Sequence, residues 1–558
     1  MEDSKLATVD MSTYFILFGG ITRRNSLIGR AIRCLASGRA GPGGNQDGET
    51  LVEGSVTIAD RHMTNDEVLA WARKIAAGLS EVGVQHGEAI NLLMRNDIEF
   101  VTCMAAANLI GAVATPVNWH FSAEDIAYII NDSGSRILVA HSDLWHTFGS
   151  GVKKRLGRDV MVLLVETPSY LRAPYRVADA DCPLREGEVA LDDWANRFPP
   201  FENDVTVKPT AMIYTSGTTG RPKGVKRAAA VSVSLKNHHN AYVHGMRCLL
   251  AAPLYHSAPF STADGVWAVD GHLVLVIRFD PEDYLAMIEK CRITHSFMVP
   301  TMFVRLLKLP DEVRAKYDLS SLEHIIHGGS PCPRDVKLKM IEWVGPVLYE
   351  LYGGTETGIV TYSTSQDFIN HPGSVGKAVS GAIVKIFDDD GNELPHGKVG
   401  EIFCRHPGYP DFTYQNRHDE RLAMEKHGLL SLGDVGYLDQ DGYLYITDRK
   451  RDMIISGGSN IYCTMVEAPF LAHPDVLDCA AFGIPHEELG ESLALAVERR
   501  PGAVLDSDAL TAFGKSMLSG FMVPKTFLFV DELPRDPSGK IYKRKLRDPF
   551  WENAQRQI

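Results

Sequence analysis

One stretch carries most of the information in this 558-residue sequence, and it reads Tyr214-Thr-Ser-Gly-Thr-Thr-Gly-Arg-Pro-Lys-Gly224. Apolar residues 211–214 predict a short strand that leads into it. Three glycines allow the backbone to turn tightly, so that main-chain N–H groups converge on an anion. The side chains that can join them are those of Thr215, Ser216, Thr218, Thr219 and Lys223, with Gly217, Gly220 and Gly224 between them. The pattern predicts a loop that holds phosphate.

This loop differs from a Walker loop, because no Gly-Lys-Ser/Thr ends it. We therefore expect the nucleotide to lie differently from the nucleotide in a P-loop ATPase. Taken alone, the stretch is also compatible with a glycine-rich surface hairpin that binds nothing.

A second glycine turn follows an apolar strand at Leu348-Tyr-Glu-Leu-Tyr-Gly-Gly-Thr-Glu-Thr-Gly358. An aromatic ring at Tyr352 suits stacking on a base, and a hydroxyl at Thr355 suits a phosphate. A carboxylate at Glu356 suits the Mg²⁺ that offsets triphosphate charge. Taken alone, this segment is equally typical of a tight turn with a solvated glutamate.

Together and in this order, the two segments resemble the adenylate-forming superfamily of acyl-CoA synthetases, peptide synthetase adenylation domains and firefly-type luciferases. The resemblance runs from about residue 63 to the C-terminus. The Tyr255-His256 pair and the Tyr-Gly-Gly-Thr-Glu motif are most similar to those of fatty- and aryl-acyl-CoA ligases. Further matching segments are Pro253-Leu-Tyr-His-Ser-Ala258, His327-Gly-Gly-Ser-Pro331, Leu432-Gly-Asp-Val-Gly436, Asp448-Arg-Lys-Arg-Asp-Met-Ile-Ile-Ser-Gly-Gly458 and Pro534-Arg-Asp-Pro-Ser-Gly-Lys540.

The expected fold is α/β, because strand-like and helix-like segments alternate after residue 63. Thr64 and Glu67 form a capping-box signature, which predicts that a helix begins there. The resemblance implies a large domain of parallel sheets covered by helices with a β-barrel-like subdomain, and a small mobile α+β domain. We expect a poorly defined segment at 1–51, the AMP-binding domain at 52–450 and the mobile domain at 451–558. The boundary falls in Asp448-Arg-Lys-Arg-Asp452, a charge cluster typical of a solvated face.

The implied chemistry is attack of a carboxylate on the α-phosphate of ATP, which gives an acyl adenylate and pyrophosphate. Two anions must meet, so positioning and cations matter most. The resemblance places Lys540 at the carboxylate and α-phosphate, and His256 at the mouth of the acyl pocket, although a structural histidine is the alternative there. It assigns the ribose to Asp434 and Arg449, magnesium to Glu356 and the hinge to Arg451. The adenine walls and the adjoining turn are assigned to Gly328, Gly329, Ser330, Glu350, Leu351, Tyr352, Gly353, Gly354 and Thr355.

The acyl pocket is expected to draw on residues 231–240, 257–265 and 328–330. Lys236 is the one lysine or arginine of these windows. The sequence therefore favours an apolar or aromatic acid over one with a second charge.

Composition narrows the function classes. A net charge of −13 argues against nucleic acid or an anionic membrane as a partner. No apolar run is long enough to span a bilayer. The nine cysteines show no CxxC pair or zinc spacing, which fits a reducing cytoplasm. Residues 21–40 are rich in arginine and lack acids, a pattern found both in transit peptides and in weakly packed chain starts.

Two acceptors of the acyl group are compatible with the sequence, because the chain departs from the related ligases near its end. Asn460-Ile-Tyr-Cys-Thr-Met-Val-Glu467 lacks the usual proline and first acid, and Met522 replaces a common basic residue. Asp448 stands where glycine is common. CoA is the expected acceptor; direct transfer to an amine is the alternative. Two further alternatives concern the function of the whole protein: a catalytically silent nucleotide-binding protein and a luciferase-like oxygenase.

Overall fold

The computed structural model describes residues 53–203, 209–215, 221–227, 241–457, 459–535 and 541–552. The chain divides into two compact units. The first contains the described residues up to Met246, with Ala263–Ile277 and Pro410–Asn416. The second contains Arg247–Thr262, Arg278–Tyr409 and the described residues from Arg417 onward.

The first unit is built on a parallel sheet with the strand order β4-β3-β5-β6. Its strands are short, apolar and largely buried, as expected where helices cover both faces. Leu93, Leu138 and Ile130 pack in its core. The strands are β3 Ala89–Leu93, β4 Val113–Pro116, β5 Ile137–His141 and β6 Met161–Val165, and the helices are α2 Asn65–Glu81, α3 Ile98–Ile110, α4 Ala123–Ser133 and α5 Ser142–Lys153.

Helix α2 begins where the sequence predicts. The Thr64 side chain accepts a hydrogen bond from the Glu67 N–H, and the Glu67 carboxylate accepts one from the Thr64 N–H at 2.8 Å. This capping box satisfies two N–H groups that a helix start otherwise leaves unpaired. Val68, Ile75 and Leu79 are buried on one face of the helix.

Smaller elements complete the first unit. β1 (Ser55–Ile58) pairs with β10 (His272–Leu275) and with β2 (Arg61–Thr64). Residues 174–203 contain short helical turns. Its remaining elements are α6 Ser169–Tyr175, η1 Asp179–Asp181, α7 Leu191–Ala195, β7 Ile213–Thr215, β8 Lys223–Arg227 and β18 Phe412–Tyr414.

The second unit has parallel strands β9-β11-β12-β13, followed by antiparallel β14 and β15. The strands are β9 Arg247–Leu250, β11 His295–Met298, β12 His324–His327, β13 Leu348–Gly354, β14 Gly358–Thr364 and β15 Lys377–Ala378. The helices in this stretch of the chain are α9 Pro281–Cys291, α10 Pro300–Leu307, α11 Asp311–Arg314, α12 Arg334–Val344 and α13 Ser365–Asn370.

An antiparallel sheet follows in the order β16-β17-β20-β19, with β21 paired to β20. Ile386, Ile402 and Leu444 lie in its core. Its elements are β16 Ile383–Phe387, β17 Gly400–Arg405, α14 His418–Ala423, β19 Glu425–Lys426, β20 Leu429–Leu438 and β21 Leu444–Arg449.

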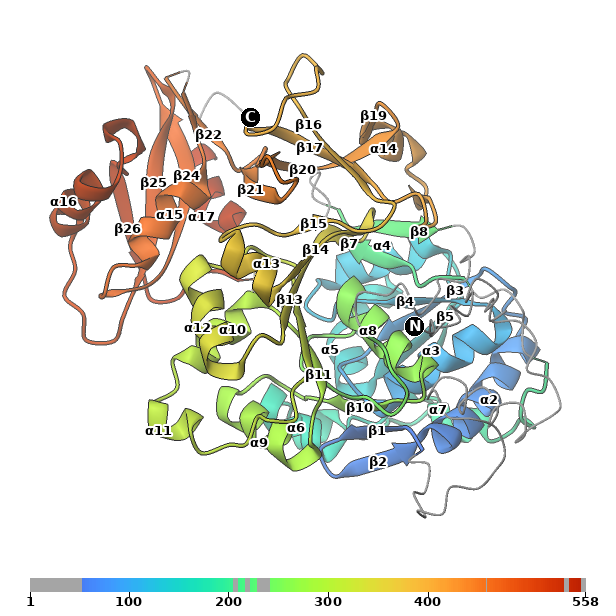
Figure 1. The fold of residues 1–558 in the computed structure, drawn as a ribbon. Coiled ribbons are helices and arrows are strands. Elements are labelled where there is room, and N and C mark those ends of the chain that lie inside the picture. Colours follow the sequence, from blue (N-terminus) through green and yellow to red (C-terminus); the bar gives the residue numbers. More distant parts are fainter. Residues whose placement is uncertain are drawn as a thin grey trace, which may run out of the picture. The chain divides into compact units, whose positions relative to one another are not determined.

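The last part of the second unit, orange to red in Figure 1, has its own sheet and helices. The strand order is β23-β22-β25-β24, and β26 pairs with β25. Val466, Phe470 and Leu495 form part of its core. The elements are β22 Ile454–Ser456, β23 Ser459–Ile461, α15 Cys463–Leu471, β24 Val476–His486, β25 Gly490–Arg499, α16 Ser507–Met517, η3 Gly520–Met522, β26 Thr526–Val530 and α17 Lys543–Trp551.

This architecture confirms the predicted fold class: parallel sheets with helices, an antiparallel sheet and a separate C-terminal α/β part. The predicted domain boundaries remain predictions. In the part of the chain that the structure describes, no helix combines the length and apolarity needed to cross a membrane.

Candidate active site

Two antiparallel strands flank the predicted phosphate loop, and they are the described part of a β-hairpin. β7 and β8 are antiparallel, and Thr215 lies opposite Lys223. The connecting residues Ser216, Gly217, Thr218, Thr219 and Gly220 lie outside the described residues, so their convergence on an anion remains a prediction.

Packing fixes the base of this hairpin. The Tyr214 hydroxyl donates to Asp132 Oδ2 at 2.7 Å. A Cβ at Gly224 would lie 2.7 Å from Cζ of the Tyr214 ring, so a side chain there would displace the ring. The Lys223 ammonium lies 5.2 Å from the centre of the Tyr414 ring, which holds the lysine at the start of β8.

Two of the predicted adenine-site glycines are required by close backbone approach. A Cβ at Gly328 would lie 2.7 Å from the Leu351 carbonyl oxygen. A Cβ at Gly353 would lie 1.9 Å from the Gly358 carbonyl oxygen. The chain that follows β12 at Gly328 therefore lies close against the middle of β13, and the end of β13 lies close against the start of β14.

Tyr352, Asp434 and Arg449 form a connected group in the second unit. The Tyr352 hydroxyl donates to Asp434 Oδ2 at 2.9 Å. The Arg449 Nε lies 3.3 Å from Asp434 Oδ1, since β20 and β21 place these residues opposite each other. Burial raises the pKa of the Tyr352 hydroxyl well above its ordinary value, and the Asp434 charge raises it further. The hydroxyl thus stays protonated as a donor. The structure brings together these three predicted nucleoside residues.

The Glu350 side chain is committed to a buried ion pair. Its Oε2 lies 2.7 Å from the Lys337 Nζ, and both side chains are almost fully buried. The Lys337 ammonium also lies 4.1 Å from the centre of the Phe368 ring. Burial raises the pKa of Glu350, and Lys337 opposes that shift. Any contact of Glu350 with a nucleotide would therefore come from its backbone.

Sequence reasoning missed Lys337 and did not consider His327 a site residue. The His327 ring is fully buried and lies 5.2 Å from the Phe303 ring, and neither ring nitrogen has a hydrogen-bond partner among the described residues. Burial lowers its pKa well below the ordinary value, and the Lys337 charge lowers it further. A neutral imidazole therefore backs the end of β12. The sequence signal for Lys337 was weak, because α12 carries several charged residues.

The predicted magnesium residue lies in the turn between β13 and β14. This turn is closed by the Gly354 N–H, which donates to Thr357 Oγ1 at 3.0 Å. Thr355 and Glu356 are partly exposed in it. One carboxylate at a partly exposed turn fits Mg²⁺, which usually takes one or two protein carboxylates and fills its other positions with water and phosphate oxygens.

His256 stands just before helix α8 (Ser257–Ala268). Its backbone N–H donates to the Pro253 carbonyl at 3.1 Å, and its carbonyl accepts from the Phe260 N–H at 3.0 Å. Its ring lies 4.6 Å from the Tyr255 ring. The local backbone thus fixes the histidine at the helix start. Lys540 and residues 231–240 lie outside the described residues.

The charge cluster at 448–452 is only partly solvated. Asp448 is 6% exposed, whereas Arg451 is exposed and lies 3.7 Å from the Asp452 carboxylate. Lys450 pairs with Glu401 at 2.8 Å and with Asp389 at 3.0 Å. The residues flanking the expected hinge at Arg451 therefore have defined partners.

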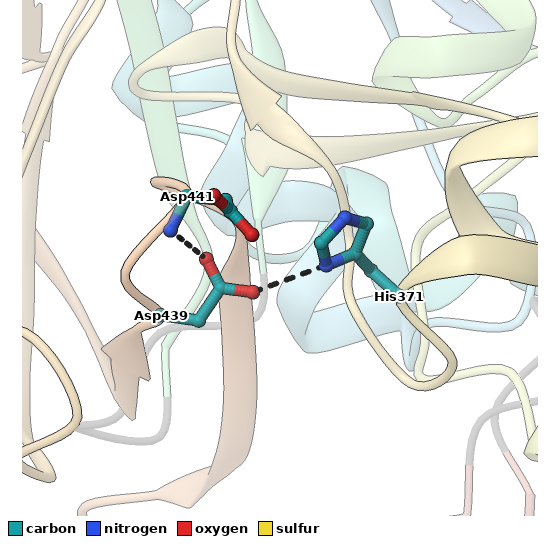
Figure 2. Close-up of side chains that lie close together, drawn as sticks. All are labelled: His371, Asp439 and Asp441. Carbon is teal, nitrogen blue, oxygen red and sulfur yellow. Dashed lines mark hydrogen bonds and ion pairs between the residues drawn. The ribbon is translucent and has the colours of Figure 1, made fainter.

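Another group of possible metal ligands consists of His371, Asp439 and Asp441 (Figure 2). Asp439 Oδ1 accepts from the N–H groups of Asp441 and Tyr443 at 3.0 and 2.9 Å, and Oδ2 lies 3.2 Å from His371 Nδ1. Burial raises the pKa of Asp439, but these bonds outweigh burial, so the net shift is downward. These contacts show a structural role for the cluster: Asp439 closes the turn between β20 and β21 and binds His371.

The chain matches known enzymes over most of its length. The AMP-binding enzyme family matches residues 46–409, and the AMP-binding enzyme C-terminal domain matches residues 465–540. A 2-succinylbenzoate–CoA ligase of Geobacillus kaustophilus is 32% identical over 485 residues, which cover 86% of this chain and 90% of the relative.

Two solved structures have similar folds. The amide bond synthetase McbA of Marinactinospora thermotolerans has a TM-score of 0.75 at 27% identity, covering 90% of this chain and 98% of that one. ATP-bound MatB of Rhodopseudomonas palustris has a TM-score of 0.75 at 26% identity, covering 92% of this chain and 98% of that one.

Proposed function

The chain belongs to the AMP-binding enzyme family, and from this premise we propose which of its residues carry out the reaction and which acid and acceptor it uses. The protein is an AMP-forming ligase. A carboxylate oxygen of the acid attacks the α-phosphorus of ATP, the bond to the β-phosphate breaks, and pyrophosphate leaves. The acyl adenylate then passes its acyl group to an acceptor, and AMP leaves.

Asp434 binds the ribose in this proposal. A carboxylate accepts hydrogen bonds from two neighbouring hydroxyls, and the Tyr352 hydroxyl and the Arg449 guanidinium hold it in place. This connected group is the observation that carries the proposal. Gly328, Gly329 and Ser330 supply one adenine wall, and the backbone of Glu350 and Leu351 with the Tyr352 ring and Gly353 supplies the other.

The triphosphate is held by the hairpin that contains Lys223. The backbone and hydroxyls of residues 215–220 bind phosphate oxygens, together with Thr355 beside Gly354. Mg²⁺, held by Glu356 and phosphate oxygens, would neutralise charge on the departing pyrophosphate. Lys540 contacts the carboxylate and the α-phosphate, where negative charge develops. Arg451 serves as the hinge about which the C-terminal part turns between the two half-reactions.

The proposed acid is an aryl or fatty carboxylic acid. His256 at the start of α8 meets the carboxylate, and the apolar face of the pocket meets the rest of the acid. The 2-succinylbenzoate–CoA ligase relative supports CoA as the acceptor. The CoA thiol sulfur then attacks the acyl carbon, and the bond from that carbon to the AMP oxygen breaks.

An amine is the second candidate acceptor. Two residues in the C-terminal part of the chain that differ from the related CoA ligases support this candidate. Cys463, where the related ligases have proline, is fully buried as the first residue of α15. Met522, where they often carry a basic residue, packs into the C-terminal core and supplies no cation for CoA phosphates. McbA, an amide bond synthetase, has a similar fold.

Mass spectrometry of the products distinguishes the two acceptors. The protein is incubated with ATP, Mg²⁺ and a panel of aryl and fatty acids, with CoA or simple amines in parallel. We expect an acyl thioester that requires both ATP and CoA. An amide product without any thioester would show that the acceptor is an amine and not CoA. The absence of AMP with every acid would contradict the proposed activation of an acid.

A further inference from the structure

The carboxylate of Asp448 binds the start of helix α15. Its Oδ2 accepts a hydrogen bond from the N–H of Cys463, the first residue of that helix, and its Oδ1 accepts from the Arg449 N–H at 2.7 Å. Beside it, the Thr464 hydroxyl donates to the backbone carbonyl of Thr447. The Asp448 side chain thus supplies an acceptor oxygen for an N–H group that a helix start otherwise leaves unpaired.

These contacts join residues on opposite sides of Arg451. Other contacts of α15 lie wholly beyond it: the Cys463 thiol donates to the Asp452 carbonyl at 3.0 Å, and Lys543 pairs with Glu467 at 2.7 Å. A rotation about Arg451 leaves those contacts intact. It separates residues 447 and 448 from residues 463 and 464.

We propose that Thr447, Asp448, Cys463 and Thr464 form a latch, which holds the C-terminal part in the described arrangement and opens when the chain turns about Arg451. This inference rests on the proposed hinge. A glycine at position 448 would have no carboxylate to cap α15.

The geometry also makes the latch sensitive to pH. Burial raises the pKa of Asp448 to about 6 from the ordinary value of 3.8; Lys543 and the two N–H donors oppose this rise, and Glu467 adds to it. The charged and titratable groups on the elements packed around Asp448 are Arg449, Tyr462, Cys463, Glu467 and Lys543. Burial raises the pKa of both the Tyr462 hydroxyl and the Cys463 thiol, so neither ionises below neutral pH.

The direction of the pH dependence follows from the linkage between proton binding and latch closure. A pKa that is higher in the latched state means that the latched state binds the proton more tightly. Below pH 4 the carboxyl is protonated in both states, and the latch is at its strongest. Between about pH 4 and 6 the open state loses its proton first, so the latched fraction falls. Well above pH 6 both states are ionised and the latch is at its weakest, with a closing equilibrium constant roughly a hundredfold lower than below pH 4.

The test measures the latch and the chemistry separately. Spin labels are introduced through unnatural amino acids at the exposed positions Asp390 and Asp508, and the distance distribution of the full chain is recorded at pH 4.5 and 8.0. Asp448→Asn keeps an uncharged acceptor for the Cys463 N–H, whereas Asp448→Gly removes the acceptor. Circular dichroism confirms folding of each variant, and Asp441→Asn, an exposed aspartate in a nearby turn, is the control.

We expect the wild type to gain a second distance at pH 8.0, as the control does. Asp448→Asn should keep the first distance at both pH values, and Asp448→Gly should show the second at both. Identical distributions for all four proteins would overturn the latch. Pyrophosphate release with the acid panel is measured in parallel. Absent release would count against the proposed function alone, because the spin-label distances report on the latch independently of turnover.

Discussion

The Tyr352 hydroxyl lies 2.9 Å from Asp434 Oδ2, although 82 residues separate the two in the chain. β13 carries the tyrosine and β20 carries the aspartate. The tyrosine therefore has two uses in our account: its ring faces the adenine, and its hydroxyl orients the carboxylate that binds the ribose.

Removing that hydroxyl should weaken ATP binding. A hydrogen bond to a charged group contributes about 1.5–3 kcal/mol, so Tyr352→Phe should raise the KM for ATP by roughly ten- to a hundredfold. The KM for the acid should stay nearly unchanged. Steady-state kinetics checks this, with Tyr362→Phe as the control. Equal effects on both substrates would show a general structural role.

The buried ion pair behind β13 should matter for stability. Lys337→Met leaves the Glu350 carboxylate buried without its partner, which should cost about 3–5 kcal/mol. The double variant with Glu350→Gln should recover part of this loss. Thermal unfolding midpoints of the variants give the comparison. Lys316→Met, which breaks an exposed pair with Glu282, should change little. Equal unfolding midpoints for Lys337→Met and wild type would show that the ion pair does not stabilise the fold.

Lys540→Ala should abolish adenylation while ATP binding remains measurable, because the lysine acts on charge that develops during phosphoryl transfer. Pyrophosphate release and calorimetric ATP binding are the two measurements. Lys545→Ala, three residues into α17, is the control. Unchanged turnover in Lys540→Ala would show that another group supplies the charge.

Arg451→Pro should permit adenylation but block acyl transfer, because proline restricts the backbone rotation on which the second half-reaction depends. The two half-reactions are followed separately, by pyrophosphate release and by thioester formation. Normal transfer in this variant would place the hinge elsewhere.

Local rules predicted much of the first unit. The capping box at Thr64 and Glu67 marked the start of α2, and the short apolar runs around Ile90 and Leu138 became buried parallel strands. Such features depend on residues close in sequence. They could be read without knowledge of the rest of the chain.

Long-range contacts were not accessible in the same way. The sequence indicated that Tyr352 and Asp434 serve one site only through the family resemblance, because no spacing rule links β13 with β20. Lys337 is indistinguishable from a surface lysine until α12 packs against β13. Asp448 belongs to a charge run that usually faces water, and its burial against Cys463 depends on where α15 begins.

Oxygen labelling tests the central claim most directly. The acid is supplied with heavy oxygen in its carboxylate, together with ATP, Mg²⁺ and CoA, and the AMP produced is weighed by mass spectrometry. Attack of the carboxylate on the α-phosphorus predicts AMP that carries one heavy oxygen, with pyrophosphate unlabelled. Unlabelled AMP, or ADP with phosphate in its place, would contradict activation through an acyl adenylate.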